Sequence, residues 1–344
     1  DELVEAFSET LDRAERSNDW VLVVADRGAG DLWRHYVSAQ SDRLVVLVDQ
    51  RYPPDAVDSL ATQRPVHLIT CLAEPDPSWW DRLAPVSHHP ANSDGFGALA
   101  RRIAGRSLGL VMAGGGARGL AHFGVYQELT EAGVVIDRFG GTSSGAIASA
   151  AFALGMDAGD AIAAAREFIA GSDPLGDYTI PISALTRGGR VDRLVQGFFG
   201  NPGLIPPVHN GEQLLVDGGL LNNLPANVMC ADTDGEVICV DLRRTFVPSK
   251  GFGLLPPIVT PPGLLRRLLT GTDNALPPLQ ETLLRAFDLA ASTANLRELP
   301  RVAAIIEPDV SKIGVLNFKQ IDAALEAGRM AARAALQAQP DLVR

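Results

Sequence analysis

The sequence predicts an α/β protein built on mostly parallel sheets. Short apolar runs of four to six residues recur along the chain, with spacers between them that are long enough for helices. Parallel strands that are buried on both faces have this continuous apolar character, and their connections are usually helical. A glycine-rich turn at 114–119 directly follows one apolar run and opens a helical pattern, which fits the same fold class.

Residues 1–106 are predicted to form a small accessory α/β unit. The expected elements are a polar amphipathic helix at about 2–18, strands at 21–26, 44–49 and 66–70, a linker from His88 to Gly95 and a helix at about 96–105. Three apolar runs separated by helical spacers again favour a parallel sheet that is covered on both faces.

Residues 107–344 repeat the pattern on a larger scale and are predicted to form a second domain. The expected strands are 108–113, 134–139, 214–216, 237–242 and 302–306, and the expected helices are 120–131, 144–154, 157–170 and 318–338. Apolar residues near helical spacing support the first of these helices.

Composition excludes several classes of protein. With 46% apolar and 21% charged residues, the chain of 344 residues has the profile of a soluble globular protein. The net charge of −11 argues against nucleic-acid binding, since a negative surface repels phosphate backbones. Three cysteines without a C-x-x-C pair favour a reducing compartment over a disulfide framework or a zinc site. No apolar stretch reaches the ~20 residues that span a bilayer, so any membrane contact is expected to be peripheral.

The run Gly141-Thr142-Ser143-Ser144-Gly145 fits the pattern G-x-S-x-G. In a nucleophile elbow, a serine sits on a sharp turn between a strand and a helix, where flanking glycines avoid clashes. The sequence context agrees, with a short strand expected before it and a helix after it. The alternative interpretation is a plain strand–helix turn with an N-capping serine.

The run Gly114-Gly115-Gly116-Ala117-Arg118-Gly119 predicts an anion-binding turn. Successive glycines let backbone N–H groups converge, and the following helix dipole favours negative charge. One candidate anion is a dinucleotide pyrophosphate, because the run also matches G-x-G-x-x-G and Asp137 lies 18 residues beyond Gly119. The other is the oxyanion of a tetrahedral acyl intermediate. A simple packing turn is the third interpretation.

Asp217-Gly218-Gly219 follows the predicted strand at 214–216. A carboxylate at a strand end, followed by two glycines, can approach another loop closely and act as a general base. A common turn dipeptide is the simpler interpretation. Together, however, the three motifs supply the nucleophile, oxyanion donors and base of an acyl-transfer site.

The same residues resemble the three hallmark motifs of patatin-like phospholipases. These are 111–119, with its Gly-Gly-Gly-Ala-Arg-Gly run, then 141–145 and 217–219. The likeness extends to Gly124-Val125-Tyr126 and to Leu221-Asn222-Asn223-Leu224-Pro225. The bacterial relatives of neuropathy target esterase are the most similar branch, and residues 1–106 loosely resemble the segment that precedes its catalytic domain.

The resemblance implies a three-layer α/β fold with a mostly parallel central sheet and a Ser-Asp dyad that needs no histidine, metal or cofactor. Ser143 is the implied nucleophile and Asp217 the implied base. The amides around Gly115, Gly116 and Ala117 would form the oxyanion hole, with Arg118 steadying the loop. The implied supporting residues are Gly114, Gly119, Gly141, Gly145, Gly218 and Gly219.

The resemblance also implies a lipid function. The expected activity is hydrolysis of phospholipid or lysophospholipid carboxylic esters by a cytoplasmic bacterial enzyme that is peripherally associated with a membrane. The apolar, proline-broken segment 251–259 and the Leu/Arg segment 264–269 are candidates for lipid contact or for an inward-packed lid. Proteins of this branch usually carry a cyclic-nucleotide-binding region upstream of the catalytic domain, so the resemblance implies such a region as a partner outside the sequence considered. The alternatives are a dinucleotide-binding module that uses Gly114–Gly119, or a catalytically silent membrane-associated regulator.

Two sequence features test the resemblance. Only His209 follows Ser143, and it precedes Asp217, so the order does not fit an α/β-hydrolase triad. Family members usually carry extra strands between the nucleophile and the aspartate, whereas Ser143 and Asp217 are 74 positions apart. Either the protein is naturally shortened near Gly200-Asn201, or the sequence as printed omits residues there. A real loss would affect the wall of the substrate channel and the activity.

Overall fold

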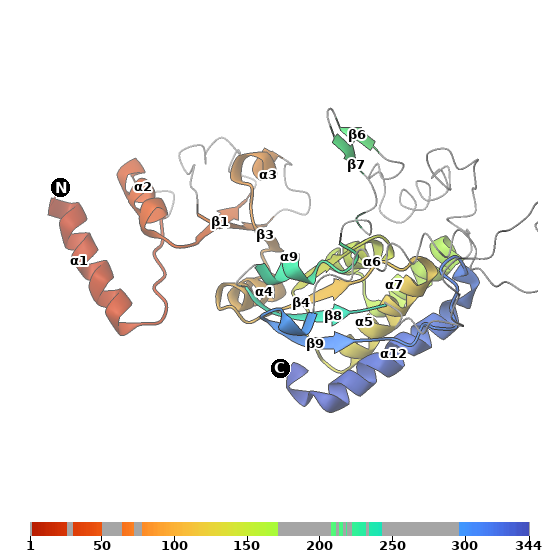
Figure 1. The fold of residues 1–344 in the computed structure, drawn as a ribbon. Coiled ribbons are helices and arrows are strands. Elements are labelled where there is room, and N and C mark those ends of the chain that lie inside the picture. Colours follow the sequence, from red (N-terminus) through yellow and green to blue (C-terminus); the bar gives the residue numbers. More distant parts are fainter. Residues whose placement is uncertain are drawn as a thin grey trace, which may run out of the picture. The chain divides into compact units, whose positions relative to one another are not determined.

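The computed structural model describes residues 2–25, 30–49, 64–71, 78–170, 208–210, 213–215, 218, 222–231, 234–242 and 296–343. The chain divides into two compact units, Asp1–Ile103 and Ala104–Arg344 (Figure 1). Each unit has its own parallel sheet.

The N-terminal unit contains a three-stranded parallel sheet with the order β1-β2-β3. Its elements are α1 (Glu2–Ser17), α2 (Asp31–Gln40), β1 (Leu44–Val48), β2 (Val66–Thr70), α3 (Ser78–Leu83), β3 (Ser87–Pro90) and α4 (Ser93–Ile103). The sheet's small core consists of Val48, Leu68 and Trp79. The helix α1 contacts α2 through edge-on packing of Phe7 against Trp33.

Two expectations for this unit are wrong. Residues 21–25 were predicted as a strand, but they form no ladder, and the side chain of Leu22 is 85% exposed. The apolar run alone could not indicate whether a neighbouring edge receives it. Residues 88–90 were predicted as a linker but form β3, which pairs with β2. Hydrogen bonds of the Ser87 hydroxyl with His67 and His89 satisfy polar atoms that made this strand look like a loop.

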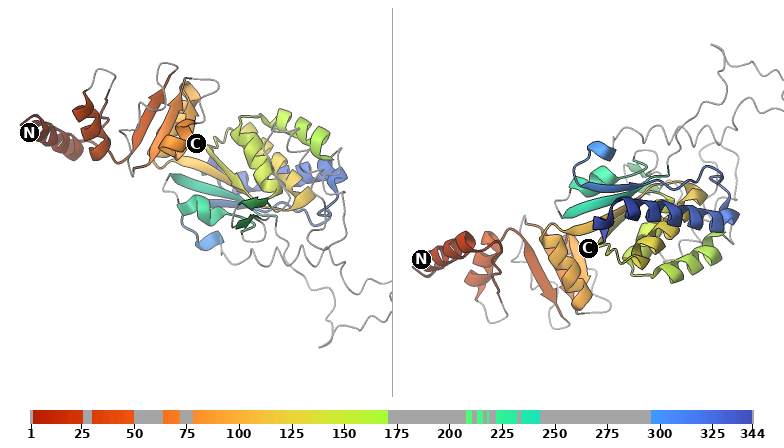
Figure 2. Two further views of the ribbon diagram at one scale, coloured as in Figure 1. Left: turned by 90° about the horizontal axis from the view of Figure 1, so that it is seen from above. Right: turned by 90° about the horizontal axis from the view of Figure 1, so that it is seen from below.

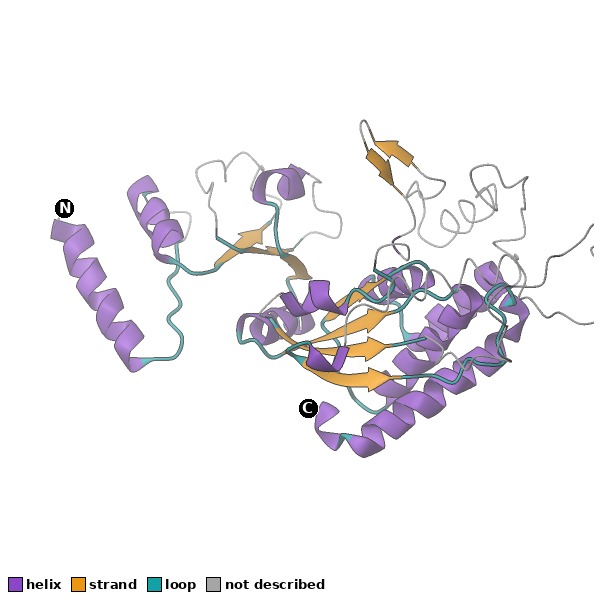
Figure 3. Ribbon diagram, viewed as in Figure 1, coloured by secondary structure: helices purple, strands orange, loops and turns teal. Residues whose placement is uncertain are grey.

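The C-terminal unit contains a four-stranded sheet with the order β5-β4-β8-β9, and all of its neighbouring strands are parallel (Figure 3). Its strands and longer helices are β4 (Ser107–Met112), α5 (Ala121–Glu131), β5 (Arg138–Gly141), α6 (Ser144–Ala153), α7 (Ala158–Ala164), α9 (Ala226–Ala231), β8 (Gly235–Val240), β9 (Val302–Ile306) and α12 (Ile321–Ala338). A separate antiparallel hairpin joins β6 (Val208–Asn210) to β7 (Gln213–Leu215). The predicted α/β class with a mostly parallel sheet is confirmed.

Side-chain alternation along β5 shows that helices cover both faces of this sheet. Phe139 packs against Tyr126 of α5 and Phe152 of α6. Its neighbour Arg138 donates from its guanidinium to the carbonyl oxygen of Met229 in α9. Because successive strand residues point to opposite faces, α9 lies on one face and α5 with α6 on the other. The unit is therefore a three-layer α/β/α arrangement.

The helices α5 and α12 pack side by side (Figure 2). Their closest approach requires glycine on each helix. A β-carbon built on Gly124 would lie 2.0 Å from the carbonyl oxygen of Leu325, and one built on Gly328 would lie 2.1 Å from that of Ala121. Such distances are far inside van der Waals contact, so neither position has room for a side chain.

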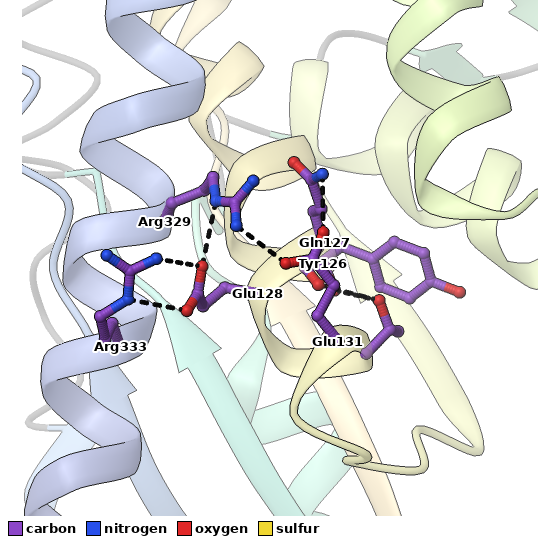
Figure 4. A network of polar contacts seen from close by, with 7 residues as sticks. Tyr126, Gln127, Glu128, Glu131, Arg329 and Arg333 are labelled. Carbon is purple, nitrogen blue, oxygen red and sulfur yellow. Dashed lines mark hydrogen bonds and ion pairs between the residues drawn. The ribbon is translucent and has the colours of Figure 1, made fainter.

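An ion-pair network connects these two helices (Figure 4). Arg329 donates to Glu128 at 3.0 Å and to Glu131 at 2.8 Å, and Arg333 makes two further bonds to Glu128. These arginines, Arg333 most strongly, lower the pKa of Glu128. The network therefore stabilises the carboxylate form of Glu128 and ties α12 to α5.

Within the ranges that the structure describes, no helix is both long and apolar enough to cross a membrane. The predicted strand at 134–139 is shifted and begins at Arg138, because Val134 to Asp137 form a connection. The candidate lipid-contacting segments 251–259 and 264–269 lie outside the described residues.

Candidate active site

Ser143 lies on the sharp turn between β5 and α6, and its side chain is exposed. Its backbone has φ 52° and ψ −121°. Among non-glycine residues in the described part of the chain, only Ala84 and Arg301 also have positive φ. This conformation costs of order 1–3 kcal/mol and persists only where the surroundings enforce it, which is common at functional sites.

The two glycines that flank this turn are enforced by main-chain contacts. A β-carbon built on Gly141 would lie 2.6 Å from the backbone of Gly145 and 2.7 Å from the carbonyl oxygen of Met112. One built on Gly145 would lie 2.2 Å from that same oxygen. Both glycines thus let the turn press against the end of β4, and the serine is raised clear of the sheet.

The glycine loop, residues 114–119, follows β4 and lies directly beside this turn. A β-carbon built on Gly114 would lie 3.3 Å from the β-carbon of Ser143. Gly114 is fixed on its other side by Asn223, whose main-chain oxygen accepts from the Gly114 amide at 3.0 Å. The side-chain amide of Asn223 donates back to the Gly114 carbonyl oxygen at 3.2 Å. Two of the three predicted motifs are therefore in contact.

The predicted oxyanion donors differ in whether their amides already donate a hydrogen bond within the protein. The Gly115 amide donates to the Ser144 hydroxyl at 3.1 Å, and the Ala117 amide donates to the carbonyl oxygen of Val315 at 2.7 Å. The Arg118 amide donates to Gly115. Among the bonds of the described residues, only the Gly116 amide in this series has no partner. Gly116 has φ 57°, which suits glycine.

A C-terminal segment that the motifs did not indicate supports the far side of the glycine loop. We call residues 313–315, which follow β9, the strap. Arg118 is buried, and its Nε donates to the carbonyl oxygen of Ile313 at 3.0 Å. The strap also receives the Ala117 amide through Val315. Because main-chain oxygens make these contacts, no residue type in the strap could have revealed them.

Asp217 and Gly219 lie outside the described residues, but their neighbour Gly218 is placed. A β-carbon built on Gly218 would lie 3.4 Å from Cγ2 of Thr142, the residue before Ser143. The hydroxyl of Thr142 donates to the main-chain oxygen of Asn222 at 2.8 Å, and the Asn222 amide donates to Gly218. Gly218 and Asn222, which follow Asp217 in the sequence, therefore lie beside the nucleophile turn.

His122 is fully buried in α5, and its Nε2 is 2.7 Å from the carbonyl oxygen of Ala113, just before the glycine loop. Burial lowers its pKa to about 4, partly opposed by this hydrogen bond. The ring is thus neutral at pH 7 and donates from Nε2. Its Nδ1 has no partner within the described part of the chain. This bond ties α5 to Ala113, the residue before the glycine loop.

The residue proposed to bind a ribose in the dinucleotide interpretation lies at the wrong end of the sheet. A carboxylate oxygen of Asp137 accepts from the amide of Leu108 at 3.2 Å, near the start of β4. The glycine loop follows the other end of that strand. At ~3.3 Å per residue, the length of β4 separates the two features.

Comparison with known proteins agrees with this geometry. Residues 110–201 match the family model for patatin-like phospholipase. An uncharacterized NTE family protein of Mycobacterium bovis is 90% identical over 384 residues, covering 100% of this chain. The corresponding protein of Mycobacterium tuberculosis strain H37Rv matches equally. This chain belongs to the patatin-like phospholipase family. The predicted branch, that of neuropathy-target-esterase-like proteins, is also confirmed.

More distant patatin-like relatives carry an activity in their names. Lysophospholipase NTE1 of Mycosarcoma maydis is 29% identical over 297 residues, which cover 72% of this chain and 16% of that protein. The chain spans only 66% of the length of the two mycobacterial relatives.

The alignments also bear on the short spacing between Ser143 and Asp217. Those with the mycobacterial proteins extend over 384 positions, 40 more than the 344 residues of this chain. The mycobacterial proteins therefore carry residues that this patatin-like sequence lacks. The family-model match ends at residue 201, next to Gly200-Asn201, where the sequence is expected to be shortened.

Proposed function

We propose that this chain is a serine acyl hydrolase that cleaves carboxylic esters of phospholipids or lysophospholipids. Ser143 is its nucleophile and Asp217 its general base. The observation that carries the proposal is the strained turn at Ser143, which exposes a hydroxyl beside a row of main-chain amides. Backbone strain of this kind clusters at active sites, and an esterase needs a serine lifted clear of its sheet.

The proposed reaction has two halves. Asp217 accepts the proton of the Ser143 hydroxyl as its oxygen attacks the ester carbonyl, and the departing lysophospholipid or glycerophosphodiester takes up that proton. A water molecule, deprotonated by Asp217, then attacks the acyl-enzyme and releases the fatty acid, and Asp217 returns this proton to the departing Ser143 oxygen. Amides of the glycine loop stabilise the negative oxygen in both halves, with Gly116 as the donor that makes no competing bond to any described residue.

Two observations favour this mechanism over its rivals. Burial and the bond to Ala113 remove His122 from proton transfer at Ser143, so this histidine beside the glycine loop is not the base. The position of Asp137 near the start of β4 is unfavourable for a nucleotide that is held by the glycine loop. The lipid class rests on the family and on the lysophospholipase relatives. Peripheral membrane association is part of the same proposal.

Covalent labelling with a fluorophosphonate tests the nucleophile. The wild-type chain is expected to be labelled at Ser143 and to hydrolyse p-nitrophenyl butyrate and lysophosphatidylcholine, and Ser143→Ala should lose all three. Asp217→Asn should lower turnover at least ~100-fold, as expected for loss of a general base. Ser149→Ala is a matched control, since Ser149 lies on the same helix but bonds to the Gly145 carbonyl oxygen.

Three outcomes would contradict the proposal. Labelling or turnover that survives in Ser143→Ala would remove the assigned nucleophile. An unreactive wild-type chain that still binds lipid vesicles would favour the silent regulator. A thermal shift with NAD that Gly116→Val abolishes, without any labelling, would favour the nucleotide-binding module.

A further inference from the structure

Ser144 joins the nucleophile turn to the glycine loop through its side chain. It is the first residue of α6, and its hydroxyl accepts the Gly115 amide at 3.1 Å. A β-carbon built on Gly119 would lie 2.3 Å from the same hydroxyl oxygen. Both ends of the glycine loop therefore pack around this one side chain, and Gly119 leaves the space that it occupies.

The Gly115 bond matters because the loop itself is intrinsically loose. Three consecutive glycines have more accessible backbone conformations than any other tripeptide, so their amides need external partners to point in one direction. Asn223 fixes Gly114, and the strap fixes Ala117. Between these anchors, the Ser144 hydroxyl accepts the Gly115 amide, and the Arg118 amide donates to the Gly115 carbonyl oxygen, so Ser144 supplies the side-chain contact that orients this segment.

We propose that Ser144 is a positioning residue that holds the Gly115–Gly116 segment with the Gly116 amide directed at the substrate carbonyl oxygen. This inference rests on the proposed function. Its physical content is preorganisation: a donor already fixed in place stabilises the developing oxyanion without paying for ordering during the reaction. The residue after the nucleophile thus contributes its hydroxyl as well as its place in the helix.

The direction of the rate change on removing the Ser144 hydroxyl distinguishes a positioning role from competition with the oxyanion for the Gly115 amide. If the Ser144 hydroxyl merely occupied a donor that the oxyanion needs, its removal would free the Gly115 amide and raise the rate. A positioning role predicts the opposite. Ser144→Ala is expected to lower kcat for p-nitrophenyl butyrate by roughly 10- to 100-fold with KM changed less than ~3-fold, because the loss affects the transition state more than substrate binding.

The structural half of the test does not depend on activity. Hydrogen exchange of the Gly115 amide, followed by NMR, should speed up at least ~10-fold in Ser144→Ala relative to wild type, because a hydrogen-bonded amide is protected until its bond opens. Ser149→Ala, which removes a hydroxyl from the same helix, should leave Gly115 protection unchanged. Equal Gly115 exchange in Ser144→Ala and wild type would overturn the proposal, whatever the activity.

The functional half uses two further variants. Ser144→Thr keeps the hydroxyl and should recover most of the lost kcat, and Gly119→Ala should mimic Ser144→Ala because its methyl group displaces the Ser144 hydroxyl. An unchanged or faster Ser144→Ala enzyme would refute the positioning role. If Gly115 protection responds as expected but the wild-type chain neither hydrolyses esters nor labels, the proposed function fails while the Ser144 contact stands.

Discussion

Two of the regions that hold the glycine loop differ in how they can be recognised from the sequence. The motif region, residues 107–153, contributes the glycines of the nucleophile turn and the hydroxyl of Ser144. The C-terminal region, residues 296–343, contributes the carbonyl oxygens of the strap and the packing of α12. The first region requires particular residue types, whereas the strap requires only a backbone in the right place. A sequence motif therefore marks only part of the structure that positions a site.

The largest effect is expected where the motif region presses on its own main chain. Gly145→Ala would place a methyl group 2.2 Å from the carbonyl oxygen of Met112, which cannot move without disturbing β4. We expect a loss of at least ~3 kcal/mol in the free energy of unfolding, at the upper end for overpacked sites, and an esterase rate below ~1% of wild type. Chemical denaturation and ester hydrolysis measure the two effects.

A second glycine provides the contrast for Gly145→Ala. Gly159 lies in α7, where a β-carbon would meet only a side-chain oxygen of Asp157 at 3.3 Å. Gly159→Ala should change stability by less than ~1 kcal/mol, since alanine is the better helix former. Comparable losses in both variants would show that the contacts of Gly145 with β4 are not what makes it necessary.

Sequence reasoning predicted the motif region well because backbone strain and close approach restrict residue type. The glycines at 141 and 145 could be assigned a steric role before any coordinates existed, and the structure provides the contacts. Periodicity likewise predicted α5 and α12, and alanine content predicted α6, to within a few residues. Such features are encoded locally, so a single sequence is sufficient to find them.

The remainder could not be predicted, since it depends on which distant segments meet. Nothing in Ile313 or Val315 indicates that their oxygens receive Arg118 and Ala117. The apolar run at 21–25 does not indicate whether a neighbouring strand pairs with it. The polar residues of β3 made it look like a loop, because the hydrogen-bond partner of Ser87 lies on another strand. Tertiary context decides these cases.

The pH dependence of stability sharpens the role of His122 within the motif region. Because the pKa of His122 is lowered from 6.5 to about 4, the unfolded chain binds a proton over this interval and the folded chain does not. The contribution of the neutral His122 ring to the free energy of unfolding is fully present above pH 6.5. It decreases as the pH falls to about 4 and does not change further below that pH. The shift corresponds to roughly 3 kcal/mol. His122→Asn should lack this part of the slope when unfolding is measured at pH 7 and 4.5. An unchanged slope would contradict the buried neutral ring.

Packing between α12 and α5 offers the corresponding perturbation of the C-terminal region. Gly328→Ala would bring a methyl group 2.1 Å from the carbonyl oxygen of Ala121, at the start of α5 and two residues after the glycine loop. We expect a loss of about 2 kcal/mol from separation of the helices. Helix propensity alone predicts a gain of up to ~1 kcal/mol in the free energy of unfolding, so the sign of the change shows whether the contact with Ala121 or helix propensity dominates. A partial loss of ester hydrolysis should accompany it if α12 helps to position the loop.

The smallest effect is expected for the ion pairs between α5 and α12. Glu128→Gln keeps the shape of the side chain but removes the charge that Arg329 and Arg333 share. We expect a loss of about 0.5 kcal/mol at low salt and less at 0.5 M salt, because partly exposed pairs are screened. The lowered pKa of Glu128 means that this contribution is present at neutral pH and disappears as acid protonates the carboxylate in the folded chain. Glu326→Gln, an exposed carboxylate on α12, is the control. If Glu128→Gln also lowered ester hydrolysis more than twofold, the ion pairs rather than the glycine contacts would be what couples α12 to the loop.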